Sequence, residues 1–390
     1  MAAGSPDGRR VVPAGYFASA AFMDGGFFLI MTAMPFRVLD LGGGALALGL
    51  TAATGAVAYI VAAPLAGRLA DRAARRPLAA LGAASLVACA LLAWWIRRLD
   101  LLVALQVLMG LGKALYWPPA QAAVGDLTPA ADRSRVLGRY NLAWSGGKGL
   151  GFVAGGLLLA RAGFEATYLA GAACVVAAAM SLPRRGARPA EDAAPDGAAI
   201  VTSDLPPGFL AMSWVANTAA YSAFGILTYH LPQYLGHRGW QADQYGWFLG
   251  AILASQTLVF LWLGLRRRQV WSRRGLWWPQ AGALLAMALL PLWNDTWPLL
   301  LTAPLLGLGC GVCYQASITA SLADPVVRGR RAGIHEGLIG AGGFAAPLLA
   351  GVLVRLGLPL AAPYLLGAAC LAAALAAQAV IGRRRGRSVT

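Results

Sequence analysis

The segment GRLADRAARR, residues 67–76, carries one aspartate, Asp71, among four arginines. It separates two apolar runs, residues 45–66 and 78–96, that contain no acid or base. A helix rises about 1.5 Å per residue and needs about 20 apolar residues to cross a bilayer, so each run is long enough to span a membrane. The segment therefore predicts a charged loop at the membrane surface, between two transmembrane helices.

The composition of the whole chain agrees with this prediction. Of its 390 residues, 58% are hydrophobic and 12% are charged, whereas soluble domains carry about 25% charged residues. The mean hydropathy is +0.62. We therefore expect an all-α polytopic membrane protein. Twelve apolar runs predict its transmembrane helices: 12–36, 45–66, 78–96, 101–122, 136–160, 166–182, 208–231, 244–264, 276–293, 297–320, 332–354 and 361–381.

The basic residues predict the orientation of these helices. With the runs placed alternately across the membrane, 24 arginines fall on one side and six on the other, and the two lysines lie within the runs. Because loops rich in Lys and Arg stay in the cytoplasm, we expect both termini there, in the inner membrane of a bacterium. The arginines form small groups at the ends of the runs, so the net charge of +16 does not indicate nucleic-acid binding.

A segment rich in Pro, Ala and acids divides the chain nearly in half. We expect a first six-helix half at 1–182, a cytoplasmic linker at 183–207 and a second six-helix half at 208–390. The halves also repeat at a shift of 195 residues: Arg133, Arg135, Gly138, Gly147 and Gly156 fall on Arg328, Arg330, Gly333, Gly342 and Gly351. Such duplication is typical of secondary transporters, whose site lies at mid-membrane between the repeats.

The loop at 67–76 resembles the signature G-x-L-A-D-R-x-G-R-[KR] of the major facilitator superfamily, with Ala74 in place of the second glycine. The resemblance implies twelve helices in two pseudo-symmetric halves and transport by alternating access. It also implies a conformational latch on the cytoplasmic side, formed by Gly67, Asp71, Arg72, Arg75 and Arg76. Retention of basic loops in the cytoplasm is the alternative for the arginines, but it leaves Asp71 unexplained.

A second stretch resembles the fifth-helix signature of the exporters in this family, G-x8-G-x3-G-P-x2-G-G. Its glycines are Gly138, Gly147, Gly151, Gly155 and Gly156. Phe152 stands where the signature has proline. The resemblance implies an exporter. The alternative explanation of these glycines is that small residues simply allow close packing of helices.

The fourth-helix signature of proton-coupled exporters, L-x3-R-x2-Q-G-x-G, is half present. Gly110 and Gly112 match it, but Gln106 stands at the position of the arginine. Lys113 lies seven residues further along, on the same face of a helix. We therefore expect Lys113 to supply the positive charge that Gln106 lacks.

Three full charges lie near the middle of predicted helices: Asp24, Lys113 and Lys148. A charge there costs about 3 kcal/mol, so such residues usually face a cavity and have partners. In the family, helices 1, 4, 7 and 10 line the central cavity and helices 2, 5, 8 and 11 border it, which implies that all three point inward. We predict that Asp24 is the proton-linked acid and that a lysine is its charge partner, with Glu336 as the next candidate acid. A buried pair that only joins helices is the alternative.

Aromatic and amide side chains are the candidates for contact with substrate. They are Gln106, Asn217, Tyr221, Tyr229, His230, Tyr314 and Gln315. Together they suit an amphipathic organic molecule, and each alone also fits a packed core.

These observations predict a secondary transporter that exports a small organic molecule in exchange for protons. Uptake by proton symport is the alternative, and a non-transporting receptor or scaffold is a weaker one. We do not expect an enzyme, because His, Ser and Asp residues occur in no catalytic spacing. We expect a monomer in the lipid bilayer, with a small-molecule substrate and protons as partners, and without nucleic acid, metal or cofactor.

Overall fold

The fold is entirely helical over the part of the chain that the computed structural model describes. That part comprises residues 12–72, 74–128, 133–183, 205–265, 271–293, 296–323 and 328–386. Its helices are α1 (Ala14–Asp40), α2 (Ala45–Arg72), α3 (Arg75–Trp95), α4 (Leu99–Leu127), α5 (Arg133–Ser181), α6 (Phe209–Gly236), α7 (Ala242–Leu265), α8 (Arg273–Leu289), the 3-10 turn η3 (Leu290–Leu292), α9 (Thr296–Leu322), α10 (Arg328–Arg355) and α11 (Ala362–Gly386). Within these residues, eleven helices are long and apolar enough to cross a membrane. The prediction of an all-α membrane protein is confirmed.

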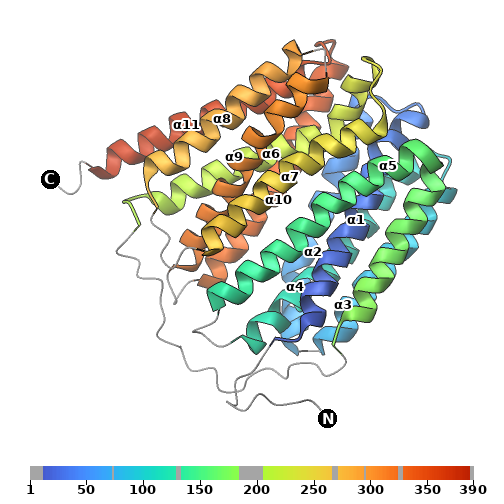
Figure 1. Ribbon diagram of the computed structural model, residues 1–390, viewed down its shortest axis with the longest axis horizontal. Helices are drawn as coiled ribbons and strands as arrows, with labels where there is room; N and C mark the ends of the chain where they lie inside the picture. Colours follow the sequence, from blue (N-terminus) through green and yellow to red (C-terminus); the bar gives the residue numbers. More distant parts are fainter. Residues whose placement is uncertain are drawn as a thin grey trace.

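Helix α5 combines two of the predicted transmembrane runs. It extends over 49 residues, and Gly163 interrupts it with φ of 77° and ψ of −171°. Because glycine adopts a positive φ far more readily than other residues, the chain can turn back here. Figure 1 shows the resulting two green arms, which contain the predicted runs 136–160 and 166–182. Twelve predicted runs therefore appear as eleven helices in the described residues, one of them a hairpin.

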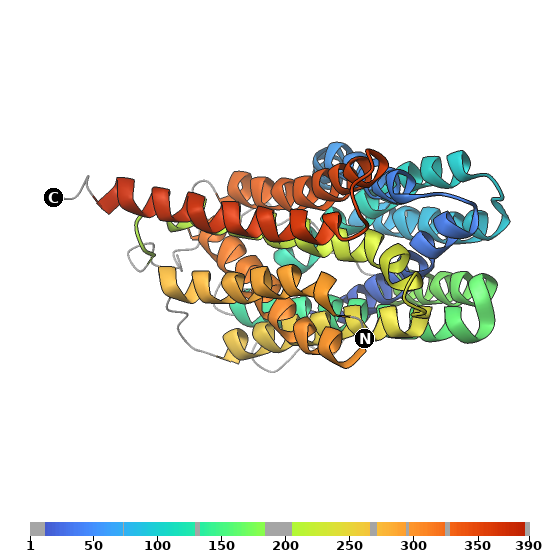
Figure 2. The same cartoon turned by 90° about the horizontal axis from the view of Figure 1, so that it is seen from above.

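The helices gather in two groups with separate hydrophobic cores. One cluster of buried side chains extends from Val12 to Leu182, and the other from Phe209 to Ala374, with Phe152 inserted from the first group. The blue-to-green helices lie together on one side and the yellow-to-red helices on the other (Figure 1 and Figure 2). Residues 184–204 of the predicted linker lie outside the described part, and the domain division at 183–207 stays a prediction.

Helix α1 packs chiefly against the two arms of α5, and glycines allow the helix backbones to approach closely. A Cβ at Gly147 on the first arm would overlap the carbonyl oxygen of Ala21. On the second arm, a Cβ at Gly171 would lie 3.0 Å from the carbonyl oxygen of Gly26. Both arms of α5 therefore contact the backbone of α1 on either side of Asp24.

Two seams of close backbone contact join the helix groups. Between α5 and α7, a Cβ at Gly246 would lie 2.5 Å from the carbonyl oxygen of Phe152. Between α2 and α10, a Cβ at Gly351 would lie 2.5 Å from the carbonyl oxygen of Ala45. Both seams lie near the N-terminal ends of α2 and α7. The two groups are therefore closed against each other at that end.

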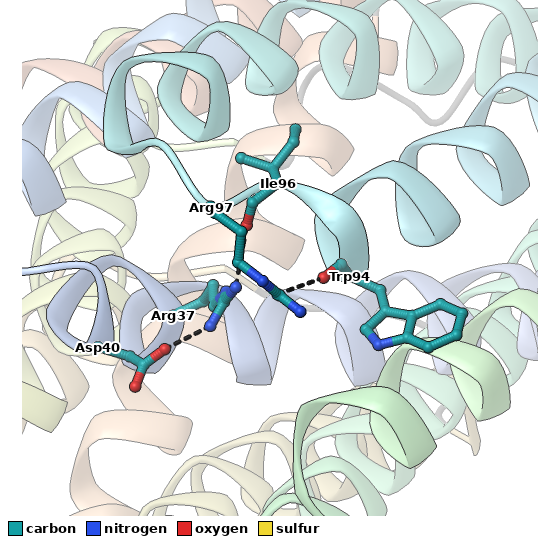
Figure 3. A network of polar contacts seen from close by, with 5 residues as sticks. All are labelled: Arg37, Asp40, Trp94, Ile96 and Arg97. Carbon is teal, nitrogen blue, oxygen red and sulfur yellow. Dashed lines mark hydrogen bonds and ion pairs between the residues drawn. The ribbon is translucent and has the colours of Figure 1, made fainter.

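A polar network holds the loops together at the same end (Figure 3). Arg37, at the end of α1, donates hydrogen bonds to the Asp40 carboxylate and to the carbonyl oxygen of Ile96, the latter at 2.9 Å. Beside it, the guanidinium of Arg97 donates to the carbonyl oxygen of Trp94 at 2.8 Å. Since Ile96 and Arg97 connect α3 to α4, the network fixes the end of α1 against this connection.

Candidate functional site

A cavity of about 260 Å³ lies between the two helix groups. Its walls come from α1, α2, α4 and α5 of the first group and from α6, α9 and α10 of the second. This volume lies just below the range of about 300 to 1,000 Å³ for typical ligand pockets, so the cavity has room only for a small molecule.

Four charged side chains line the cavity: Asp24 on α1, Lys113 on α4, Lys148 on α5 and Glu336 on α10. Asp24 interacts electrostatically with both lysines, and Lys113 with both Asp24 and Glu336. Lys148 in turn interacts with Asp24 and with Lys113. We call these four side chains, Glu336, Lys113, Asp24 and Lys148, the charge row. Of the ion pairs between described residues, none includes either lysine.

Aromatic rings hold the two ammonium groups. The Nζ atom of Lys148 lies 4.5 Å from the ring centroid of Phe28 and 4.3 Å from that of Phe224. The Nζ atom of Lys113 lies 4.6 Å from the ring centroid of Phe27 and 5.2 Å from that of Tyr59. At these distances the negative face of a ring attracts a cation.

Sequence reasoning missed Phe27 and Phe28 as partners of the lysines. The signal was present, because the two rings follow Asp24 by three and four residues in MDGGFF. Side chains at this spacing share one face of a helix. An acid that faces a cavity therefore predicts that these rings face it too.

The predicted polar residues divide into two sets. Those that line the cavity are Gln106, Tyr221, Tyr229 and Tyr314. Those that the structure does not bring to its wall are Asn217, His230 and Gln315. His230 instead forms a hydrogen bond of 2.8 Å with the carbonyl oxygen of Pro347 on α10, and Gln315 donates to Thr319 at 3.4 Å. Asn217 is fully buried, and its amide has no hydrogen-bond partner among the described residues.

Two tryptophans of the cavity wall also escaped sequence reasoning, namely Trp117 and Trp144. Trp144 on α5 packs edge-on against Tyr314 on α9, with ring centroids 5.8 Å apart. One residue further, the hydroxyl of Ser145 lies 2.7 Å from that of Thr257 on α7. This part of α5 therefore contacts two helices of the second group, α7 and α9.

The glycines of the exporter-like motif have different neighbours. A Cβ at Gly151 would overlap the backbone of α1, and a Cβ at Gly156 the backbone of α7. A Cβ at Gly155 would lie 2.8 Å from the side chain of Thr32, while Gly138 has open space around it. The motif thus permits close packing at all positions but the first.

In the loop at 67–76, Arg75 forms an ion pair with Asp126 near the end of α4. Sequence reasoning missed Asp126, although an acid at the end of an apolar run beside a basic loop is a usable signal. The side chain of Asp71 lies outside the described residues. The remaining predicted latch residues, Gly67, Arg72 and Arg76, lie near the same helix ends, and both arginines are exposed.

Membrane-spanning helices in two groups around a charged cavity define a membrane transport protein. The family model of the Major Facilitator Superfamily matches residues 16–289, which is more than half of the chain. The chain therefore belongs to the Major Facilitator Superfamily, and its function is transport rather than catalysis.

Solved structures share the fold over nearly the whole chain. A bacterial homologue of the human lysosomal transporter Spinster, inward-facing and occupied, is 14% identical with a TM-score of 0.68, and the match covers 96% of each chain. The human organic anion transporter MFSD10 is 19% identical with a TM-score of 0.64, over 96% of this chain and 100% of that one. The nucleoside transporter NupG is 13% identical with a TM-score of 0.71, over 94% and 98%. At these identities the likeness is one of fold alone.

A sequence relative matches a shorter stretch. Protein spinster of Drosophila melanogaster is 31% identical over 99 residues, which is 25% of this chain and 16% of that protein. The match thus spans well under two thirds of the relative's length.

Proposed function

We propose that this transporter exports a small organic molecule in exchange for protons, by alternating access of the cavity to the two sides of the membrane. The observation that carries the proposal is the charge row in the cavity between the helix groups. Each charge near the bilayer centre costs about 3 kcal/mol, so the three at mid-helix, Asp24, Lys113 and Lys148, which line one cavity together with Glu336, favour a role in transport over a purely structural one.

Asp24 is the proposed proton-linked acid. Its two lysine neighbours support its negative charge, while burial in the helix bundle opposes it. When the helix groups rock and a lysine moves away, the carboxylate loses this support and binds a proton. When the lysine returns, the proton leaves. The same carboxyl group can thereby take up a proton on one side of the membrane and release it on the other.

The aromatic contacts of Lys148 support a link between this proton and the rocking motion. Phe28 belongs to the first helix group and Phe224 to the second. Rocking of the groups therefore separates one ring from the ammonium and changes how strongly Lys148 is held near Asp24.

The rocking bodies in this proposal are the halves 1–182 and 208–390. The linker 183–207 and both termini face the cytoplasm of a bacterial cell, and one chain transports without a partner. The loop at 67–76 acts as the latch on the cytoplasmic side. The ion pair of Arg75 with Asp126 supports this role, because it holds the loop against the end of α4.

Export is supported by the glycine motif of α5, which packs against α1 and α7 as close contacts between moving helices require. Uptake by proton symport is the second candidate. One observation favours it: a proton on Asp24 leaves Lys148 without a charged acid beside it, which would attract an anionic substrate. MFSD10, a transporter of organic anions, shares the fold.

The test is transport by the purified full-length protein in liposomes that enclose a pH-sensitive dye. A panel of small organic acids, amines and neutral molecules is added outside in turn. Exchange predicts that the lumen becomes alkaline as substrate enters, and symport predicts that it becomes acidic. Substrate entry without a pH change in the lumen would contradict proton coupling, and entry of no compound would contradict transport of small organic molecules.

A further inference from the structure

Lys148 is the less compensated of the two lysines of the charge row. Its only carboxylate neighbour among the described residues is Asp24, which also interacts with Lys113. Lys113 itself lies between two acids, Asp24 and Glu336. One shared acid therefore faces the Lys148 ammonium, whereas two acids face that of Lys113.

Besides Asp24, the charged group that interacts with the Lys148 ammonium among the described residues is another cation, Lys113. The side chain of Lys148 is 7% exposed and lies between the rings of Phe28 and Phe224. The adjoining wall on α6 consists of residues without charge: Tyr221, Gly225, Thr228 and Tyr229. An ammonium has three N–H donors, and no hydrogen bond between described residues uses those of Lys148. An anionic group would accept hydrogen bonds from these donors and would also compensate the positive charge of the ammonium.

We propose that Lys148 is the anion-recognition group of the transport site and that the substrate is a small organic anion with one flat apolar ring. The inference rests on the proposed function, because it names the substrate class of the same cavity. The anionic group accepts hydrogen bonds from the Lys148 ammonium. The ring of the substrate rests among the aromatic side chains of the wall, such as Trp144 and Tyr229. A volume of about 260 Å³ restricts the substrate to roughly one ring with a short polar tail.

The charge row disfavours a cationic substrate. Each of its acids has a lysine neighbour, since Asp24 lies between Lys148 and Lys113, and Glu336 beside Lys113. A cation would therefore meet a carboxylate only together with an ammonium that repels it. An anion at Lys148 meets the uncharged wall on α6, and of the two cavity acids only Asp24 is a neighbour of Lys148, whereas Glu336 is a neighbour of Lys113.

Protonation of Asp24 removes its repulsion of the anion, so the anion and a proton support each other's binding, which is the linkage that the second candidate function, proton symport, requires and that exchange does not. The anion should accordingly bind more tightly at lower pH. The groups that interact electrostatically with Asp24 are Lys113, Lys148, Tyr59, Tyr116, Tyr140, Tyr221 and Tyr314. Tyrosine hydroxyls, with an ordinary pKa of about 10, stay protonated between pH 6 and pH 8. The Asp24→Asn variant distinguishes the Asp24 carboxyl group from the other ionisable groups of the cavity, Glu336, Lys113 and Lys148.

The experiment measures binding to the purified full-length protein in lipid nanodiscs by calorimetry. The probes are 3-phenylpropanoate, 3-phenylpropylamine and 3-phenylpropanol, which share a ring and a chain length and differ in charge. We expect the anion to bind at least about 10-fold more tightly than the alcohol, because a hydrogen bond to a charged group adds to the same ring contacts. Its affinity should rise as the pH falls from 8 to 6.

Matched variants assign the preference to Lys148. Lys148→Gln should remove the difference between anion and alcohol, and Lys148→Arg should keep most of it. Lys113→Gln, which removes the other ammonium of the cavity, should keep the preference. Asp24→Asn should bind the anion as the wild type does at low pH, without dependence on pH. The melting temperature of each ligand-free variant reports folding, and where Lys148→Gln does not fold, the comparison of probes on the wild type decides.

The proposal is overturned if the amine or the alcohol binds as tightly as the anion, if no probe binds, or if Lys148→Gln keeps the preference. Each of these results leaves the transport function intact. Conversely, tight and Lys148-dependent binding of the anion, without its movement into proteoliposomes, would overturn the proposed transport function and leave the binding site standing.

Discussion

The Nζ atom of Lys148 on α5 lies 4.3 Å from the centroid of the Phe224 ring on α6, so a cation of one helix group rests on an aromatic face of the other. A contact of this kind contributes about 0.5 to 2 kcal/mol, depending on how far water is excluded. It stabilises the arrangement in which the two groups are closed at the N-terminal ends of α2 and α7. Alternating access requires that it break.

Phe224→Leu should therefore shift the protein away from this arrangement while the fold persists. Leucine keeps the apolar contact but lacks the face that attracts the cation, so we expect a change of about 5-fold in the ratio of the two states. Distances between spin labels placed on the first and second helix groups measure this ratio. Phe248→Leu on α7 is the control, because that buried ring lies outside the cavity wall. An equal shift in the control would show that lost packing, not the cation contact, is responsible.

The seam between α5 and α7 permits an equally direct test. Gly156→Ala adds a Cβ that overlaps the carbonyl oxygen of Ala242, whereas Gly138→Ala on the same helix adds one in open space. Both changes improve helix propensity by about 1 kcal/mol. We expect Gly156→Ala to lower transport at least about 10-fold. In a Trp144→Cys background it should also make the cysteine reactive toward reagents added on the side of the membrane where the N-terminal ends of α2 and α7 lie. Normal transport by Gly156→Ala would mean that this seam need not close.

The latch at 67–76 predicts a change of state rather than a loss of folding. Asp71→Asn should shift the protein toward inward-open states and slow transport, because the only acid of the loop would lose its charge. Arg75→Gln should act in the same direction, since it breaks the ion pair with Asp126. Cysteine accessibility from the cytoplasmic side measures the shift. The latch is refuted if Asp71→Asn keeps both the normal rate and the normal accessibility.

Topology can be tested at the end of the chain. The distribution of arginines predicts that both termini and the segment 183–207 lie in the cytoplasm. A reporter that is active only outside the cytoplasm should stay silent when it is fused after Thr390. Strong activity of that fusion would reverse the orientation.

Hydropathy predicts most of the fold, because each helix must satisfy its own backbone within the lipid. This holds for α5 as well, whose two arms were predicted as the separate runs 136–160 and 166–182. Gly163, which has a positive φ, lies between these runs and turns the chain there.

The charges of the cavity were predictable because a charge in lipid is costly, so a charged residue in a transmembrane helix usually faces a cavity. The polar residues of α6 were less so, because their direction depends on helical register. Tyr221, Phe224, Gly225, Thr228 and Tyr229 line the cavity at the spacing of one helix face. Asn217 lies one turn beyond that stretch, and His230 is turned toward α10, where it bonds Pro347. Spacing places Phe27 and Phe28 on the helix face of Asp24, but which lysine each ring contacts depends on the packing between helices, as do the contacts of Tyr59 and Phe224.

The central claim is that Asp24 couples proton movement to transport. Its most direct test compares Asp24→Asn with Asp100→Asn, an acid at the start of α4 that pairs with the exposed Arg98. Both variants are reconstituted in liposomes, where exchange of labelled substrate and proton-driven accumulation are measured separately. We predict that Asp24→Asn keeps exchange but loses accumulation and its dependence on pH, whereas Asp100→Asn keeps both. Accumulation by Asp24→Asn with the pH dependence of the wild type would contradict the claim and make Glu336 the next candidate for the coupling acid.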